Sequence, residues 1–239
     1  MQTPLSILLI HGHGVDASIW DGIYADLAAE GTVLNPDLSR LTSHTTIEAY
    51  AEELAARLQA VSISEVVLIG HSMGGYIALA FAGRYPEMVR GLVLYHSTAY
   101  ADDEDRKAQR QQLIKTMQTE GGVQFIEKQL PKMVAPDYPA DQVNKLVGRF
   151  RNLPTEALVA GMEAIAGRPD RTYVLRNATF PVLLVMGRED QLIPLEKTKP
   201  LADLSGQISI ATIDNAGHMS MVEQPDESKK ILVDFLRKL

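Results

Sequence analysis

Short stretches of consecutive apolar residues alternate along the chain with longer stretches in which apolar residues recur every three or four positions. The short stretches are typical of strands buried on both faces, and the longer ones of helices with one apolar side. The pattern predicts strands at residues 5–10, 32–35, 66–70, 91–95, 182–186 and 208–213. Because strands separated by helices form parallel sheets, we expect a doubly wound α/β sheet of about six strands, with 32–35 at an edge.

Capping residues indicate where several of the helices begin. Ser18 with Asp21, and Thr45 with Glu48, have the spacing of a capping box, in which each side chain bonds the other residue's backbone N–H. Pro225 is at a favoured first helical position, and we expect the last helix to begin there.

The alternation of strands and helices stops between residues 99 and 177, where only helical patterns separated by glycine or proline occur. The sequence therefore predicts a core formed by residues 1–98 and 178–239, with a helical insertion at 99–177. The charged residues at 102–107 are interpreted as a solvated helix start, with acids near the positive end of the helix dipole. If the insertion covers a pocket, some of its bulky side chains must face the sheet, among them Met117, Phe125, Phe150 and Met162.

The strand at 66–70 leads into Gly70-His71-Ser72-Met73-Gly74, which fits the pattern G-x-S-x-G. In a nucleophile elbow this pattern turns a strand sharply into a helix and presents the serine at the turn. The glycines are needed because a Cβ two residues before or after Ser72 would collide across the turn, and Ser72 itself would have a strained backbone.

A serine hydroxyl needs a base to accept its proton, and that base needs an acid to orient it. Functional residues of a parallel sheet gather at the carboxyl ends of the strands. Asp190 and His218 each follow a predicted strand in this way, and together with Ser72 they have the chain order Ser, Asp, His. Asp214 is a less suitable acid, because it ends the last strand close to His218 in sequence.

The other histidines are interpreted mainly as structural or surface residues. We expect His11 and His71 to bond backbone groups beneath the site, and His44 to lie at the surface. His96 follows a strand and is a candidate for facing the pocket. The side chain of His13 is equally compatible with a pocket position and a structural role.

Four landmarks in order make the chain resemble the α/β-hydrolase superfamily from residue 5 to the C-terminus, outside the variable insertion. They are His11-Gly12, the motif at 70–75, Gly187-x-x-Asp190 with Pro194, and Gly217-His218 with Glu223 and Pro225. The resemblance implies Ser72 as nucleophile, Asp190 as orienting acid, His218 as base, and the insertion as a cap over the pocket. Residues 167–170 are similar to the capped subgroup of esterases, enol-lactonases and carbon–carbon hydrolases. The family's N-terminal antiparallel hairpin is expected to be missing, because only residues 1–4 precede the first strand.

An oxyanion hole follows from the same arrangement. The backbone N–H of Met73 lies at the start of the helix after Ser72, where the dipole also favours negative charge. We expect the second donor to be the backbone N–H of His13, directly after His11-Gly12.

The composition of the chain excludes one kind of nucleophile and argues against two kinds of partner. The chain of 239 residues has no cysteine, which excludes a thiol nucleophile, and its net charge of −7 argues against nucleic acid or an anionic membrane as a partner. No apolar stretch near the start is long enough for a membrane span or a leader, so a cytoplasmic location is expected.

No cofactor or metal is expected. A metallo-hydrolase built on His11, His13 and Asp16 is a weak rival, because no further ligand cluster accompanies them.

The sequence therefore predicts a serine hydrolase that cleaves a small or medium carboxylic ester or lactone through an acyl-enzyme on Ser72. An ester or lactone of modest size is the preferred substrate, because the insertion is small and neither of its faces has a cationic cluster in the sequence. A carbon–carbon bond hydrolase and a thioesterase would use the same residues. A ligand receptor of this fold with little turnover is the alternative from another class. The sequence does not indicate the oligomeric state.

Overall fold

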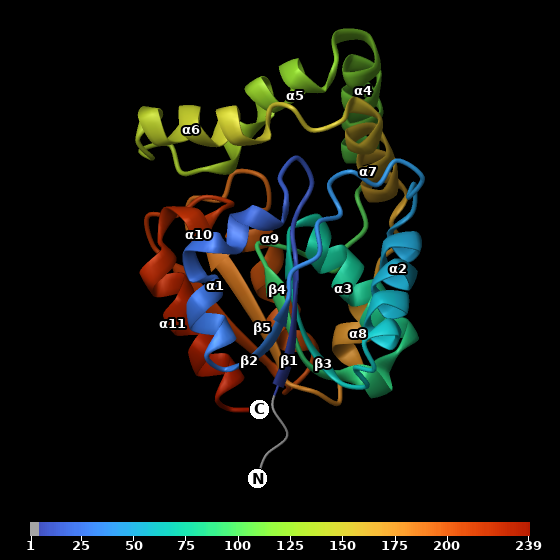
Figure 1. The fold of residues 1–239 in the computed structure, drawn as a ribbon, viewed down its shortest axis with the longest axis vertical. Helices are drawn as coiled ribbons and strands as arrows, with labels where there is room; N and C mark the ends of the chain where they lie inside the picture. The colour runs from blue at the N-terminus through green and yellow to red at the C-terminus, as the bar shows by residue number, and fades with distance from the viewer. Residues whose placement is uncertain (1–4) are drawn as a thin grey trace.

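A computed structural model, which describes residues 5–239, contains one sheet of six parallel strands (Figure 1). In the order in which they pair, the strands are β2 (Gly31–Leu34), β1 (Leu5–Ile10), β3 (Val66–His71), β4 (Val89–Tyr95), β5 (Val182–Gly187) and β6 (Ile208–Ile213). The predicted parallel sheet is confirmed, with β2 at one edge, and none of the described strands pairs antiparallel.

The sheet is apolar on both faces because alternate side chains of a strand point to opposite sides. In β1, Ile7 and Leu9 enter one core cluster while Leu8 and Ile10 enter the other. The helices on the first face are α1 (Asp21–Ala28) and α11 (Pro225–Leu236). Those on the second are α2 (Ile47–Ala60), α3 (Met73–Arg84) and α8 (Thr172–Arg176). Burial on both sides explains why the central strands β1, β3, β4 and β5 appear in the sequence as almost continuous apolar stretches.

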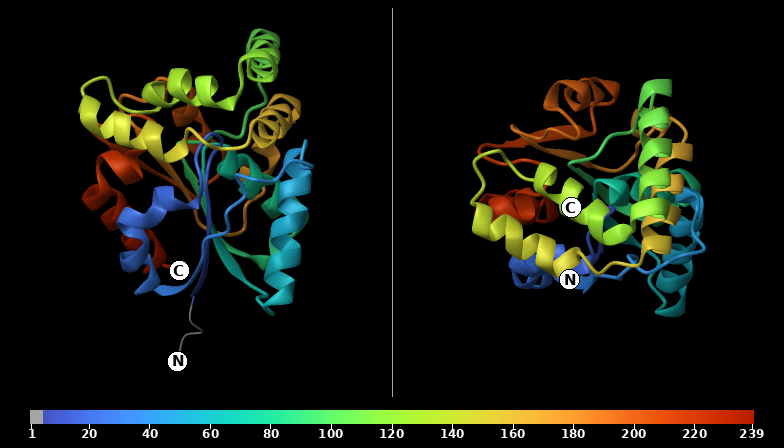
Figure 2. Two further views of the ribbon diagram at one scale, coloured as in Figure 1. Left: turned by 45° about the horizontal axis from the view of Figure 1, so that its top comes forward. Right: turned by 90° about the horizontal axis from the view of Figure 1, so that it is seen from above.

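Between β4 and β5 the chain forms helices that extend across the carboxyl ends of the strands (Figures 1 and 2). They are α4 (Glu104–Glu120), α5 (Gly122–Gln129), α6 (Ala140–Phe150) and α7 (Thr155–Gly167), followed by α8 on the sheet. We call α4 to α7 the roof helices. The division into a core and a cap domain at residues 99 and 177 stays a prediction.

Two predicted helix starts are wrong by one or two residues. The first helical turn begins after Asp16, whose side chain accepts a hydrogen bond from the backbone N–H of Ser18 at 2.9 Å. The cap of α2 is Thr46 rather than Thr45, and its hydroxyl accepts from the N–H of Ala49 at 3.2 Å. In both places a neighbouring residue has an equally suitable side chain, and the backbone direction of the loop decides which one caps.

The remaining short elements connect the sheet to its helices. They are the single-turn helices α9 (Leu195–Thr198) and α10 (Ser220–Glu223) and the 3₁₀ turns Ala17–Trp20, Pro86–Met88, Leu130–Met133 and Lys199–Leu204. Over residues 5–239, no helix has the length and apolar character needed to cross a membrane.

Candidate active site

Ser72 lies at the sharp turn between β3 and α3. Its φ of 53° and ψ of −116° are on the positive-φ side that L-residues rarely adopt, so the predicted strain is confirmed. The turn is held by the backbone, because the N–H of Ser72 donates to the carbonyl oxygen of Tyr95 at 2.9 Å. A Cβ on Gly70 would meet the carbonyl oxygen of Gly74, and a Cβ on Gly74 would meet that of Ile10. The two glycines are therefore required by close backbone approach.

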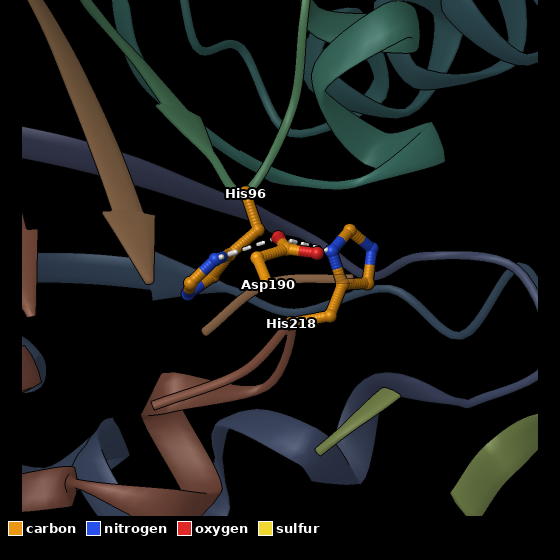
Figure 3. A group of neighbouring side chains, drawn as sticks. All are labelled: His96, Asp190 and His218. Carbon is orange, nitrogen blue, oxygen red and sulfur yellow. Dashed lines mark hydrogen bonds and ion pairs between the residues drawn. The ribbon is translucent and has the colours of Figure 1, made fainter. Parts of the chain in front are cut away.

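Asp190 and His218 come together from the loops after β5 and β6. His218 Nδ1 lies 2.7 Å from Asp190 Oδ2, and both side chains are almost fully buried (Figure 3). The other carboxylate oxygen accepts the backbone N–H groups of Leu192 and Ile193 at 2.9 Å each. Burial opposes ionisation of Asp190, but the charge and hydrogen bond of His218 outweigh it and hold the pKa of Asp190 well below its usual range. Asp190 is thus an ionised acceptor that fixes the ring of His218 with the proton on Nδ1.

The buried carboxylate of Glu223 holds the loop that carries His218. It accepts hydrogen bonds from Gly217 N and Met219 N, both at 2.9 Å, and from Ala135 N at 2.7 Å. The backbone N–H of His218 donates in turn to the carbonyl oxygen of Met133 at 2.8 Å. The segment between α5 and α6 is therefore bonded directly to the loop of His218.

His96 lies on the other side of Asp190, at the end of a chain of hydroxyl groups. Ser228 donates to the carbonyl oxygen of Ser220, so Tyr95 donates to Ser228 and Ser220 donates to Tyr95. The hydroxyl of Ser220 must then accept the proton on His96 Nε2, at 2.7 Å. His96 Nδ1 is left as an acceptor for the N–H of Gly187 at 3.2 Å.

Because burial lowers the pKa of His96, this ring is neutral. Its 3.3 Å contact with Asp190 is therefore not a strong hydrogen bond, although the two side chains lie side by side (Figure 3). His96 is packed behind the Asp190–His218 pair and is absent from the lining of the cavity described below. The sequence left its position open, and the structure assigns it to the support of the site.

His96, Asp190 and His218 place ligand-type atoms within 4.8 Å of one another. A tetrahedral Zn²⁺ ion with ligand bonds of about 2.0–2.1 Å would hold two ligand atoms about 3.3 Å apart. His218 Nδ1 and Asp190 Oδ2 are 2.7 Å apart, and His96 Nε2 already faces Ser220. The geometry therefore fits a hydrogen-bonded pair better than a metal site.

His11 has the expected structural role. Its Nε2 accepts the N–H of Leu38 at 2.9 Å, and its Nδ1 faces the carbonyl oxygen of Gly12 at 2.8 Å. His13 faces a different partner, and Asp16 caps the first helical turn. These three residues do not converge, which contradicts the weak rival interpretation of a metallo-hydrolase site.

His71 also has the expected structural role. It is buried, and its Nε2 donates to the carbonyl oxygen of His218 at 2.8 Å. His44 is half-buried beside the ring of Tyr50. Asp214 is exposed and pairs with Arg188, so it does not serve His218.

The side chain of His13 both lines the cavity and bonds a roof helix. Its Nε2 donates to the carbonyl oxygen of Leu158 in α7 at 2.7 Å. Burial lowers the pKa of His13 to about 4, and the nearby charge of Arg110 adds to the shift. The ring is therefore neutral at pH 7 and ties the loop after β1 to the roof helices.

A cavity of about 310 Å³ lies between the carboxyl ends of the strands and the roof helices. Ser72, His218 and His13 all line it. Of the bulky residues expected to face the sheet, Phe125 and Met162 line the cavity, whereas Met117 and Phe150 are buried elsewhere in the core.

The family model of the alpha/beta hydrolase family matches residues 7–228. This chain belongs to the alpha/beta hydrolase family. The first curated relatives it matches, uncharacterized proteins of Mycobacterium, are 35% identical over 104 residues, and this chain spans only 30% of their length. A 2-hydroxy-6-oxo-2,4-heptadienoate hydrolase of Pseudomonas putida is 25% identical over 96% of this chain and 88% of its own.

Solved structures of the family are similar over the whole chain. A thermophilic esterase from Thermogutta terrifontis, solved with malate bound, has a TM-score of 0.92 and 29% identity, covering 100% of this chain and 91% of that one. The enol-lactonase from Burkholderia xenovorans LB400 has a TM-score of 0.86 and 22% identity, covering 99% of this chain and 92% of that one. The second likeness shows the fold alone.

In this alpha/beta hydrolase the segment at 102–107 is not simply a solvated helix start. A helix does start here, with Asp103 as its cap, but the Asp102 carboxylate is buried and bonds Arg110 at 2.5 Å and Arg168 at 2.7 Å. Arg106 lines the cavity. The charge pattern alone could not show that these side chains turn inward, because that depends on how α4 packs on α7.

The expectation that the insertion has no cationic cluster is also wrong. Arg106, Arg110 and Lys132 all line the cavity, and the sequence analysis predicted a pocket position for none of them. The four-residue spacing of Arg106 and Arg110 was the only available signal, since it places both on one side of a helix.

Proposed function

We propose that the protein is a serine hydrolase that cleaves a small or medium carboxylic ester or lactone through an acyl-enzyme on Ser72. One observation carries the proposal. Ser72, in its strained turn, opens into the same cavity as His218, whose Nδ1 is bonded to the ionised Asp190 at 2.7 Å.

In the proposed reaction Ser72 attacks the substrate carbonyl while His218 Nε2 accepts the hydroxyl proton. The backbone N–H groups of Met73 and His13 stabilise the oxyanion, and Met73 is the first residue of α3, where the helix dipole adds to the effect. His218 then protonates the leaving group and activates a water molecule that releases the acid. Asp190 stabilises the imidazolium that forms in each step.

The proposal is tested by the turnover of a short aryl ester. Replacing Ser72 with alanine should lower kcat by about 10⁶-fold, because the remaining site can only bind and polarise the substrate. Ser97→Ala is a suitable control, since Ser97 is buried beside the turn and donates only to the carbonyl oxygen of Ser72 at 2.7 Å. A Ser72→Ala variant with activity within tenfold of wild type would refute the assignment of the nucleophile.

Carbon–carbon bond hydrolysis is the second candidate, because the Pseudomonas putida relative has the name of a dienoate hydrolase. It uses the same residues and differs in the bond that is broken. Parallel assays with aryl esters and with a 2-hydroxy-6-oxo dienoate separate the two candidates, and faster turnover of the dienoate would favour the second. No observation favours the thioesterase or the receptor-like alternative.

A further inference from the structure

The charges that line the cavity over Ser72 are all of one sign. Arg106, Arg110 and Lys132 line it, and none of its described lining residues is acidic. The positive charge of the cavity wall contrasts with the net negative charge of the whole chain, which has 30 acidic residues and 23 basic ones. The remaining wall is largely apolar, with residues such as Leu113, Ile126 and Ile165. A cationic cavity of this kind favours an anionic ligand.

Arg110 is held in place by a carboxylate that it shares. Asp102 binds both Arg110 and Arg168, so two guanidinium groups share one negative charge. Arg168 does not line the cavity; its guanidinium lies 4.1 Å over the ring of Tyr76 and also donates to the carbonyl oxygen of Ile165. Arg110 donates a hydrogen bond from Nε to the carboxylate of Asp102. Among the described residues, its Nη1 faces only a weak acceptor, Met162 Sδ at 3.7 Å. One positive charge is left without a partner at the cavity wall.

The second arginine stands one helical turn away. Arg106 Nη2 donates to the carbonyl oxygen of Leu192 at 2.9 Å, and the N–H of Leu192 donates to Asp190. Arg106 is thus placed beside the loop that carries Asp190. The charge of Arg110 also contributes to the lowered pKa of His13, another residue that lines the cavity.

We propose that Arg110 and Arg106 bind a carboxylate of the substrate, so that the cavity accepts an anionic ester or lactone with a short aliphatic chain. The inference deepens the proposed function and rests on it for the position of the reacting carbonyl. Guanidinium groups bind carboxylates through paired N–H donors, and a partly buried site strengthens the bond relative to water. A cavity of about 310 Å³ fits a compact substrate of this kind.

The test compares esters that differ only in a carboxylate. In the first pair, mono-4-nitrophenyl glutarate carries the carboxylate on its acyl group and 4-nitrophenyl pentanoate is the neutral match. In the second pair, 3-carboxyphenyl pentanoate carries the carboxylate on its alcohol group and phenyl pentanoate is the neutral match. After subtraction of the non-enzymatic rate, wild type should prefer the anionic ester of at least one pair by tenfold or more in kcat/KM. Arg110→Gln should lower that preference by roughly tenfold to a hundredfold, mainly through KM.

Arg106→Gln is the second variant, because it leaves the cluster around Asp102 intact, and it should lower the preference in the same direction. The control is Lys107→Gln, which makes the same charge change on α4 at a side chain that pairs with Glu104 outside the cavity. It should leave the preference within twofold of wild type. Equal turnover within both wild-type pairs, or a preference that both arginine variants leave unchanged, would overturn the anion site.

Failure of the anion site and failure of the hydrolase proposal give different results. If wild type hydrolyses both esters of each pair equally well, the anion site is refuted and the hydrolase stands. If no ester is turned over, calorimetry with glutarate decides the matter. The absence of turnover would then count against the proposed ester hydrolase, whereas glutarate binding that is lost in Arg110→Gln would support the anion site and no binding would overturn it.

Discussion

Glu223 gives the sharpest structural prediction, because one side chain holds both the loop of His218 and a segment of the roof. Replacing it with glutamine keeps the size of the side chain but turns one acceptor oxygen into a donor. The amide oxygen can still accept from Gly217 and Ala135, whereas the N–H of Met219 would face an amide N–H₂. Hydrogen bonds to charged groups contribute about 1.5–3 kcal/mol each, and an unpaired buried donor costs about 1–3 kcal/mol.

Part of that loss is offset, because burial raises the pKa of Glu223 and so penalises its charged form. We therefore expect Glu223→Gln to lower the free energy of unfolding by about 2 kcal/mol, which for a chain of this length lowers Tm by about 4–8 °C. The kcat for a short ester should fall by about tenfold, because Met219, directly after His218, loses its bond, and Gly217, directly before it, keeps a bond only to a neutral amide oxygen.

Thermal unfolding and steady-state kinetics on the same preparations measure both effects. Glu227→Gln is the matched control, since it makes the same change four residues along at an exposed position. A Glu223→Gln protein with a Tm within about 1 °C of wild type and an unchanged kcat would refute the reasoning.

Three further predictions concern the turn, the acid and the histidine that joins the roof. Gly70→Ala should destabilise the protein by more than about 3 kcal/mol, because its Cβ would meet the backbone of Gly74. Gly148→Ala, in open space on α6, should be neutral or stabilising by up to about 1 kcal/mol. Equal unfolding temperatures for the two variants would contradict this prediction. Asp190→Asn should lower kcat by about 10⁴-fold while leaving the far-ultraviolet circular dichroism unchanged, and a loss below tenfold would show that another acid serves His218. His13 has a pKa of about 4 when folded and 6.5 when unfolded, so the unfolded chain takes up the proton first as pH falls, and stability is lost between pH 6.5 and about 4. In urea unfolding, the stability of His13→Gln should fall by about 3 kcal/mol less than that of wild type across that window. Parallel pH profiles of the two proteins would contradict this prediction.

Local sequence patterns predicted most of the fold, because the central strands β1, β3, β4 and β5 are largely buried and appear in the sequence as almost continuous apolar stretches. They also brought Asp190 and His218 together, since both follow strands whose carboxyl ends meet at one edge of the sheet. Helix starts were less certain, because Asp16 and Thr46 each compete with a neighbour of similar capping ability.

The cationic wall of the cavity was missed for a different reason. Arg106 and Arg110 lie on a helix whose overall pattern is strongly polar, and nothing local distinguishes a buried arginine from a solvated one. The position of Arg110 depends on Asp102 and Arg168, which are separated by 66 residues and meet only through tertiary packing. The spacing of apolar residues along the sequence therefore does not predict polar networks between distant segments.

The central claim is that Ser72 forms the covalent intermediate, and trapping it is the most direct test. The protein is incubated with an aryl alkylphosphonate, digested, and analysed by mass spectrometry of the peptide that contains Ser72. We expect one label per chain, located on Ser72, with loss of esterase activity in proportion to labelling and no label in Ser72→Ala. Labelling at another residue, or continued ester hydrolysis by a fully labelled protein, would contradict the assignment.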